Sequence, residues 1–146
     1  MKVVLLLVFL IVSCRPSNQI SELVGVINER PLEETVWLLV ELNGKQVSST
    51  EEKPIFVIYH TEENKLNGFG GCNAFTGSYK TEGKYISALV ASTRMFCENK
   101  MEIETEIIKA LSERNKYEIK GSHLYLKGKG KVIAKFLAEA DKSSSG

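Results

Sequence analysis

The sequence has almost no excess of charge of either sign. Its 146 residues include 19 lysines and arginines against 18 aspartates and glutamates, a formal net charge of +1. Proteins that bind nucleic acid through its phosphates usually carry a strongly basic surface or domain. The overall charge balance therefore predicts no nucleic-acid partner.

Residues that could build a catalytic or metal centre are also few. His60 and His123 are the only histidines, and the sequence has neither a His-Glu-x-x-His pattern nor a close pair of cysteines. Cys72 would need a neighbouring base to act as a nucleophile, and both histidines are expected on the surface at strand ends. A Gly-x-Ser-x-Gly turn is missing as well. We therefore predict that the protein is not an enzyme and holds no metal or cofactor.

No apolar run reaches the length of about 20 residues that spans a bilayer as a helix. The run of residues 3–12 follows Lys2 and ends before Ser13 and Cys14, an arrangement typical of a secretory signal. Residues 10–14, Leu-Ile-Val-Ser-Cys, resemble a lipobox, the cleavage site of bacterial lipoproteins. This resemblance implies that residues 1–13 are removed and that Cys14 carries a thioether lipid. An ordinary signal peptide with an incidental cysteine is the alternative.

The predicted anchor also indicates a location. Stable attachment needs more than one acyl chain, and the likeness to bacterial lipoproteins implies two or three, such as palmitate. Arg15 follows the cysteine, where an aspartate would favour retention in the inner membrane. We therefore expect a protein of the bacterial cell envelope, held at the outer membrane and facing the periplasm.

The length suits a single folded domain after the signal. Residues 14–34 are predicted to form the lipidated cysteine and a tether, and residues 35–138 the domain. The apolar residues within the tether fit either a marginal helix or an added strand. Residues 139–146 are polar and small, and we expect a flexible tail.

Short runs rich in β-branched and aromatic residues predict eight strands. They cover residues 35–42, 54–60, 65–69, 74–79, 85–90, 116–120, 124–127 and 132–137. Asn43-Gly44 is a strong signal for a hairpin turn after the first strand. In the fourth strand, alternation places Phe75 and Tyr79 on one face of the sheet.

One helix is predicted over about residues 100–114. Its apolar face consists of Ile103, Ile107, Ile108 and Leu111. Four glutamates are expected largely outside that face: Glu102, Glu104, Glu106 and Glu113. Asn99 is the expected N-cap of a capping box. One helix among many short strands predicts an α+β fold with a strongly twisted, mostly antiparallel sheet or partial β-barrel.

The most distinctive stretch is Gly68-Phe69-Gly70-Gly71-Cys72-Asn73. A dinucleotide-binding fingerprint would need a glycine at the sixth position and a helix after it. Here the sixth residue is Asn73 and a strand is expected next. The stretch therefore predicts a bulge or tight bend, in which positive φ angles favour glycine and tolerate asparagine.

Two smaller groups of residues leave alternatives open. Lys127, Lys129 and Lys131 could contact anionic headgroups, or could protect a sheet edge from aggregation, which is the interpretation we favour. Cys72 and Cys97 could form a disulfide in an oxidising compartment or remain two buried thiols.

Together these motifs resemble the META domain family, which includes the heat-shock protein HslJ. The resemblance lies in Trp37-x-Leu39, Gly70-Gly71-Cys72-Asn73-x-Phe75-x-Gly77-x-Tyr79, Thr93-x-Met95-x-Cys97, and Tyr117-x-Ile119-x-Gly121-x-x-Leu124-x-Leu126. It covers about residues 35–137. It implies a compact α+β domain, often in the envelope, with no established enzymatic activity and with links to heat shock and antibiotic tolerance.

The resemblance implies structural roles for the motif residues rather than catalysis. We expect a lipid-anchored envelope protein that binds an unknown protein or apolar ligand, or supports stress tolerance. The alternative is a structural or assembly accessory of an envelope complex. An uncharacterised enzyme is the third and least favoured interpretation.

Overall fold

The computed structural model describes residues 29–49 and 52–140 of the chain. The predicted signal segment, the lipid site at Cys14, residues 15–28 of the tether and residues 141–146 of the tail lie outside these ranges.

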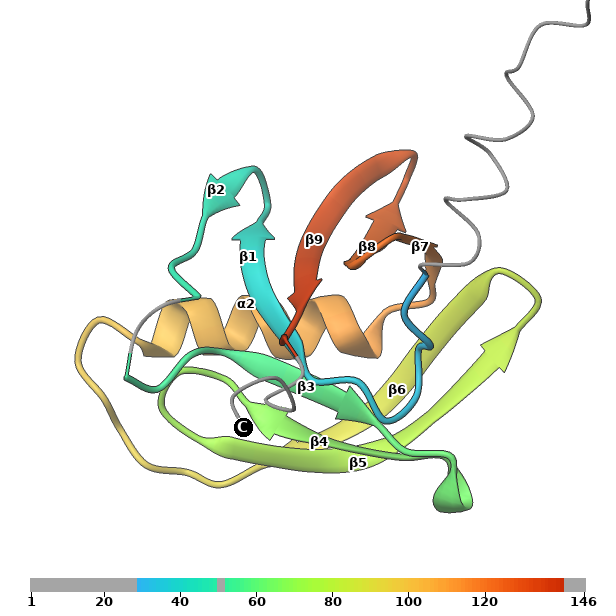
Figure 1. Ribbon diagram of the computed structural model, residues 1–146. Helices are drawn as coiled ribbons and strands as arrows, with labels where there is room; N and C mark the ends of the chain where they lie inside the picture. The colour runs from blue at the N-terminus through green and yellow to red at the C-terminus, as the bar shows by residue number, and fades with distance from the viewer. Residues whose placement is uncertain (1–28, 50–51, 141–146) are drawn as a thin grey trace, which may run out of the picture.

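Antiparallel strands make up about half of the described chain (Figure 1). They are β1 (Trp37–Leu42), β2 (Lys45–Gln46), β3 (Phe56–Tyr59), β4 (Lys65–Phe69), β5 (Ala74–Glu82), β6 (Tyr85–Ser92), β7 (Asn115–Lys120), β8 (His123–Gly128) and β9 (Lys131–Ala138). Neighbours in the sheet follow the order β2-β1-β3-β4-β5-β6-β7-β8-β9, and β9 also pairs with β1. This last pairing closes eight strands into a barrel, so the α+β class with an antiparallel, barrel-like sheet is confirmed.

Alternation along the strands explains which residues face the interior. In β5, Phe75 and Tyr79 are 3% and 6% exposed, while Thr76, Ser78 and Lys80 face solvent, as predicted. The hairpin between β1 and β2 turns at Asn43 and Gly44, whose φ angles of 49° and 79° are both positive. Positive φ at both central residues matches the right-handed twist of the strands that the turn connects.

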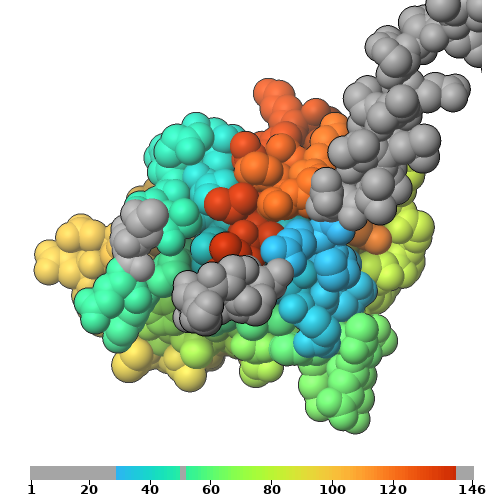
Figure 2. Space-filling view, viewed as in Figure 1, coloured from blue at the N-terminus to red at the C-terminus, as the bar shows by residue number. Residues whose placement is uncertain are grey.

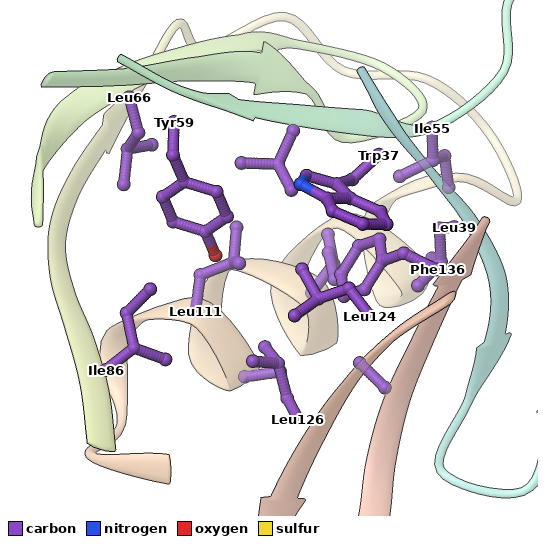
Figure 3. Packing of buried hydrophobic residues seen from close by; sticks show 14 of the residues in the cluster. Trp37, Leu39, Ile55, Tyr59, Leu66, Ile86, Leu111, Leu124, Leu126 and Phe136 are labelled. Atoms are coloured by element: carbon purple, nitrogen blue, oxygen red, sulfur yellow. The ribbon is translucent and has the colours of Figure 1, made fainter. Parts of the chain in front are cut away.

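Side chains fill the barrel and leave a single core. Figure 3 shows Trp37, Tyr59, Leu124 and Phe136 gathered beside the helix. None of these four is more than 1% exposed. Burial of one large apolar side chain stabilises a fold by about 1.5–3 kcal/mol, so this cluster supplies much of the driving force for folding.

The helix α2 (Met101–Ser112) occupies the place where β6 and β7 diverge. These strands pair only at Tyr85↔Lys116 and Ile86↔Asn115, and α2 packs along the rest of β6. Ile107 and Leu111 are buried against the core, as the predicted apolar face requires. The helix therefore closes the opening that the short pairing leaves (Figure 1).

Two details of the predicted helix are wrong. Lys100, not Asn99, is the N-cap, and no side chain caps the helix. Asn99 has a φ of 63°, a left-handed conformation that belongs to the preceding turn. Glu104, expected outside the apolar face, is only 4% exposed.

The folded domain begins before the predicted boundary at Thr35. Leu32 is 6% exposed and packs in the core, and its carbonyl accepts a 2.9 Å hydrogen bond from Nε1 of Trp37. Arg30 N donates to Gly121 O in the β7–β8 turn at 3.1 Å. Residues 30–34 of the predicted tether therefore pack on the barrel, and their backbone contacts are long-range ones that local patterns do not reveal.

Replacement of Phe136 by alanine tests the core. Phe136 is fully buried in β9, so we expect Phe136→Ala to lower the free energy of unfolding by about 3–5 kcal/mol. Val132, on the same strand, is 36% exposed, and Val132→Ala should cost about 1 kcal/mol or less. Chemical denaturation of both variants provides the comparison. Equal losses would show that Phe136 does not lie in the core.

Candidate functional site

A buried carboxylate organises one end of the barrel. Glu104 projects from the first turn of α2 toward the turn between β4 and β5. Its Oε2 accepts hydrogen bonds from the backbone N–H groups of Cys72, at 3.2 Å, and Asn73, at 2.6 Å. Its Oε1 accepts Nδ2 of Asn73 at 2.7 Å. Because a buried carboxylate is costly unless it is hydrogen-bonded, these three donors make its position tenable.

Asn73 extends this network to the loop that follows β6, residues 93–97, which we call the 93–97 loop. Asn73 Oδ1 accepts hydrogen bonds from Thr93 Oγ1, at 2.8 Å, and from the backbone N–H of Met95, at 2.7 Å. Its Nδ2 also donates to Met95 O at 3.0 Å. Both amide hydrogens and both acceptor positions of Asn73 are thus in use. The side chain, whose residue is only 1% exposed, joins the turn and the loop.

The glycines before Asn73 allow the close approach to the helix. Gly70 N donates to Asn73 O at 2.9 Å, which closes the turn between β4 and β5. A Cβ atom at Gly70 would lie 2.7 Å from Cγ of Glu104. Gly71 has a φ of 109°, where other residues are strained. The structure thus confirms a tight bend at this stretch.

A disulfide fixes the far end of the 93–97 loop. Cys72 and Cys97 are bonded in the structure, with their Cα atoms 5.7 Å apart. The cross-link spans 25 residues, which corresponds to about 3–4 kcal/mol of stabilisation in the chain-entropy model. The loop is therefore held by Asn73 at Thr93 and Met95 and by the disulfide at Cys97.

The same loop exposes two large apolar side chains. Met95 is 61% exposed and Phe96 is 83% exposed. They border a hollow of about 400 Å³ between the loop and α2, to which Met101 and Ile108 contribute apolar wall. The hollow and the two exposed side chains form the candidate binding site.

A second polar cluster lies at the other side of the barrel, where the N-terminal segment meets β3. His60 Nδ1 is 3.1 Å from Glu34 Oε2, and His60 Nε2 contacts Asn67 Oδ1. The hydroxyl of Tyr79 lies 3.3 Å from Glu33 Oε1. Burial, and then the charge of Glu33, raises the pKa of Tyr79 to about 12. This cluster ties the segment to the barrel and offers no acid–base pair near the hollow.

The other motif residues serve the barrel itself. Trp37, Phe75 and Tyr79 are buried in the core. A Cβ atom at Gly77 would lie 2.0 Å from Leu89 O, so this position of β5 admits only glycine beside β6. The structure therefore brings together Gly70, Gly71, Cys72, Asn73, Thr93, Met95 and Cys97, and it places the remaining motif residues elsewhere.

Glu104 is the functional residue that sequence reasoning missed. Its spacing from Ile107 and Leu111 places it on the same helix face as the core residues, so the signal was present. The assignment failed because a charged residue is expected on the solvent side by default.

Residues 29–49 and 52–140 contain no group of three or more histidines, cysteines or acidic residues that could hold a metal ion. Over the same ranges, no helix has both the length and the apolar character required to cross a membrane.

The META domain family matches residues 30–140 of this sequence. The chain belongs to the META domain family. A protein solved by NMR is 25% identical over 72% of this chain and 90% of its own, with a TM-score of 0.59. An NMR structure of a protein from Burkholderia xenovorans is 21% identical, covers 94% of this chain and 99% of its own, and has a TM-score of 0.59. No curated protein matches the chain significantly.

Substitution of Glu104 by glutamine tests the network of this META domain. The amide that replaces one carboxylate oxygen would point an N–H group at the donors of Cys72 or Asn73. We expect a loss of about 1–3 kcal/mol in the free energy of unfolding, because a buried donor is then left unsatisfied. Glu102→Gln, on the exposed face of the same turn, should cost less than about 1 kcal/mol. Equal stability of the two variants in urea unfolding would refute the role of Glu104.

The two histidines of the META domain should titrate on opposite sides of pH 6.5. Hydrogen bonds to Asn67 and then to Glu34 raise the pKa of His60, while burial and then Lys135 lower the pKa of His123. The His60 contacts therefore stabilise the fold below pH 6.5, and this contribution disappears as the pH rises through the raised pKa of His60. NMR titration of the ring protons measures both values.

The variant Glu34→Gln supplies the control for this titration. It removes one acceptor charge from His60, so the pKa of His60 should fall while that of His123 stays unchanged. A His60 pKa at or below 6.5 in the unmodified protein would contradict the geometry. A backbone hydrogen bond from Thr61, followed by the bond to His60, lowers the pKa of Glu34. The contribution of ionised Glu34 to the free energy of unfolding is therefore lost only as the pH falls through that lowered pKa.

Proposed function

We propose that this META-domain protein is a non-enzymatic, lipid-anchored component of the bacterial envelope that binds a protein partner through the 93–97 loop. The observation that carries the proposal is the exposure of Met95 and Phe96 on a loop that is held at both ends. Exposed apolar side chains that border a hollow are typical of interaction sites.

Rigidity makes the loop suited to recognition. The network from Glu104 through Asn73 fixes the backbone at Met95, and the disulfide fixes Cys97. Binding of a partner to Phe96 therefore costs little conformational entropy, because this loop is already ordered. Aromatic anchors of this kind often dominate the binding energy of protein interfaces.

The surface, rather than the barrel interior, is the place for a ligand. β1 and β9 pair and close the sheet into a barrel. The interior is filled by side chains such as Trp37, Leu66 and Phe136, which are fully buried. This favours a partner that docks on the outside.

The state of Cys72 supports a role without catalysis. Its sulfur is bonded to Cys97 and is therefore no thiolate nucleophile. His60 is held by Glu34 and Asn67 in the second polar cluster. The proposal of a lipid anchor is based on the lipobox-like residues 10–14. The proposal of an outer-membrane location is based on Arg15, which stands where an aspartate would favour the inner membrane.

Comparison of Phe96→Ser with Leu89→Ser tests the proposal. Both residues are highly exposed, at 83% and 79%, but only Phe96 borders the hollow. In detergent extracts of membranes, we expect a stoichiometric protein partner to co-purify with the unmodified protein and with Leu89→Ser, and to be lost with Phe96→Ser. Retention of the partner by both variants would contradict the loop as binding site. Intact mass of the same preparations tests the lipid on Cys14.

A further inference from the structure

The strands β7, β8 and β9 carry a net positive charge, whereas the rest of the chain is net negative. Residues 115–138 contain six lysines and one glutamate, a balance of +5 in a chain whose total is +1. The remaining residues therefore carry −4. The lysines are Lys116, Lys120, Lys127, Lys129, Lys131 and Lys135.

The fold gathers these lysines on the outer surface of the barrel. Leu124, Leu126 and Phe136 point inward and are at most 1% exposed, so their neighbours along β8 and β9 point outward. Across the sheet, Lys116 pairs with Lys127 in register. We call the outer surface of β7–β9 with its connecting turn the lysine face.

Little negative charge compensates the lysine face. Glu118 lies 3.1 Å from Lys120 and also contacts Lys127, and bonds to Lys127 and then Lys120 lower its pKa to about 2. Among the described residues, Lys116, Lys129 and Lys131 form no ion pair. The lysine face therefore carries an excess of positive charge that its one glutamate does not balance.

Protection of a free sheet edge explains only part of this positive charge. β8 lies between β7 and β9, and β9 pairs with β1 from Trp37↔Ala138 to Leu42↔Ala134. Lys116, Lys127 and Lys135 stand at strand positions that are paired on both sides, so edge protection does not explain them. Only β7 beyond Tyr117 and β9 before Ile133 have a paired neighbour on one side alone.

The lysine face also lies where the chain enters the domain. Arg30 N donates to Gly121 O, in the turn between Lys120 and His123. Figure 2 shows the blue N-terminal segment directly beside the orange and red of β7–β9. Fourteen residues separate Cys14 from Glu29, a reach of at most about 50 Å when extended. A lipid on Cys14 would therefore keep the domain within about 50 Å of the bilayer, attached at a point beside this face.

We propose that the lysine face docks on the anionic headgroups of the membrane in which the protein is anchored. The inference rests on the lipid anchor of the proposed function. Each lysine near an anionic surface strengthens association by about fivefold, and the effect weakens with salt, since the Debye length is only about 8 Å at physiological ionic strength. The lipid would supply attachment, and the lysine face would set the orientation of the domain.

Lysine footprinting of the full, membrane-extracted protein tests the proposal. The protein is reconstituted into vesicles of phosphatidylcholine alone or of phosphatidylcholine with phosphatidylglycerol, and acetylation of each lysine is followed by mass spectrometry. We expect Lys120, Lys129 and Lys135 to react about fivefold more slowly on the anionic vesicles. Lys45, which lies on β2, should react equally on both.

Charge reversal supplies matched variants. Lys116→Glu with Lys131→Glu removes exposed charges from the lysine face, whereas Lys45→Glu with Lys53→Glu changes the net charge equally elsewhere. Only the first pair should abolish the protection of Lys120, Lys129 and Lys135. Circular dichroism verifies that both variants are folded.

Three outcomes would overturn the inference while leaving the anchor intact. These are equal reaction rates on both vesicles, equal effects of the two charge reversals, and protection by a soluble polyanion but not by anionic vesicles.

Intact mass separates the two proposals. A protein without lipid on Cys14 refutes the anchor, and flotation of Cys14→Ser with anionic but not neutral vesicles then still tests the lysine face.

Discussion

The buried carboxylate of Glu104 is the interaction on which the candidate site depends. It joins three segments that are distant in sequence: the helix, the turn between β4 and β5, and, through Asn73, the 93–97 loop. A carboxylate in this position is stable only because three N–H groups point at it. The turn in its turn depends on the carboxylate. Without it, the buried backbone N–H groups of Cys72 and Asn73 would lose this acceptor.

The closed barrel determines where the molecule can interact. Its interior is filled by the core, α2 covers the gap between β6 and β7, and residues 30–34 pack at the β7–β8 turn and beside β3. The proposed binding therefore takes place on the outer surface. There the structure presents two different chemistries, the apolar 93–97 loop beside α2 and the lysine face on β7–β9. In the proposed arrangement the lysine face meets the membrane and the loop meets a protein.

Local patterns predicted much of this fold because alternation and turn residues act over a few positions. All strands except the two-residue β2 follow from such patterns, as do the turn at Asn43 and the helix near 101–112. Closure of the barrel does not, since it depends on the register between β1 and β9, which are almost a hundred residues apart. The site was half visible: its glycines, cysteines and Asn73 stood out, but Glu104 resembled the solvent-facing glutamates around it. Only the three donors on the turn distinguish it.

Amide hydrogen exchange tests most directly whether Glu104 holds the turn and the loop as one unit. The amide of Asn73 donates to Glu104, and that of Met95 donates to Asn73. If the network is continuous, Glu104→Gln accelerates exchange of both amides together by about tenfold or more, a change of about 1.4 kcal/mol in the opening free energy. The amide of Tyr117, bonded to Lys84 O outside the network, should change less. Faster exchange at Asn73 with unchanged protection at Met95 would contradict the account.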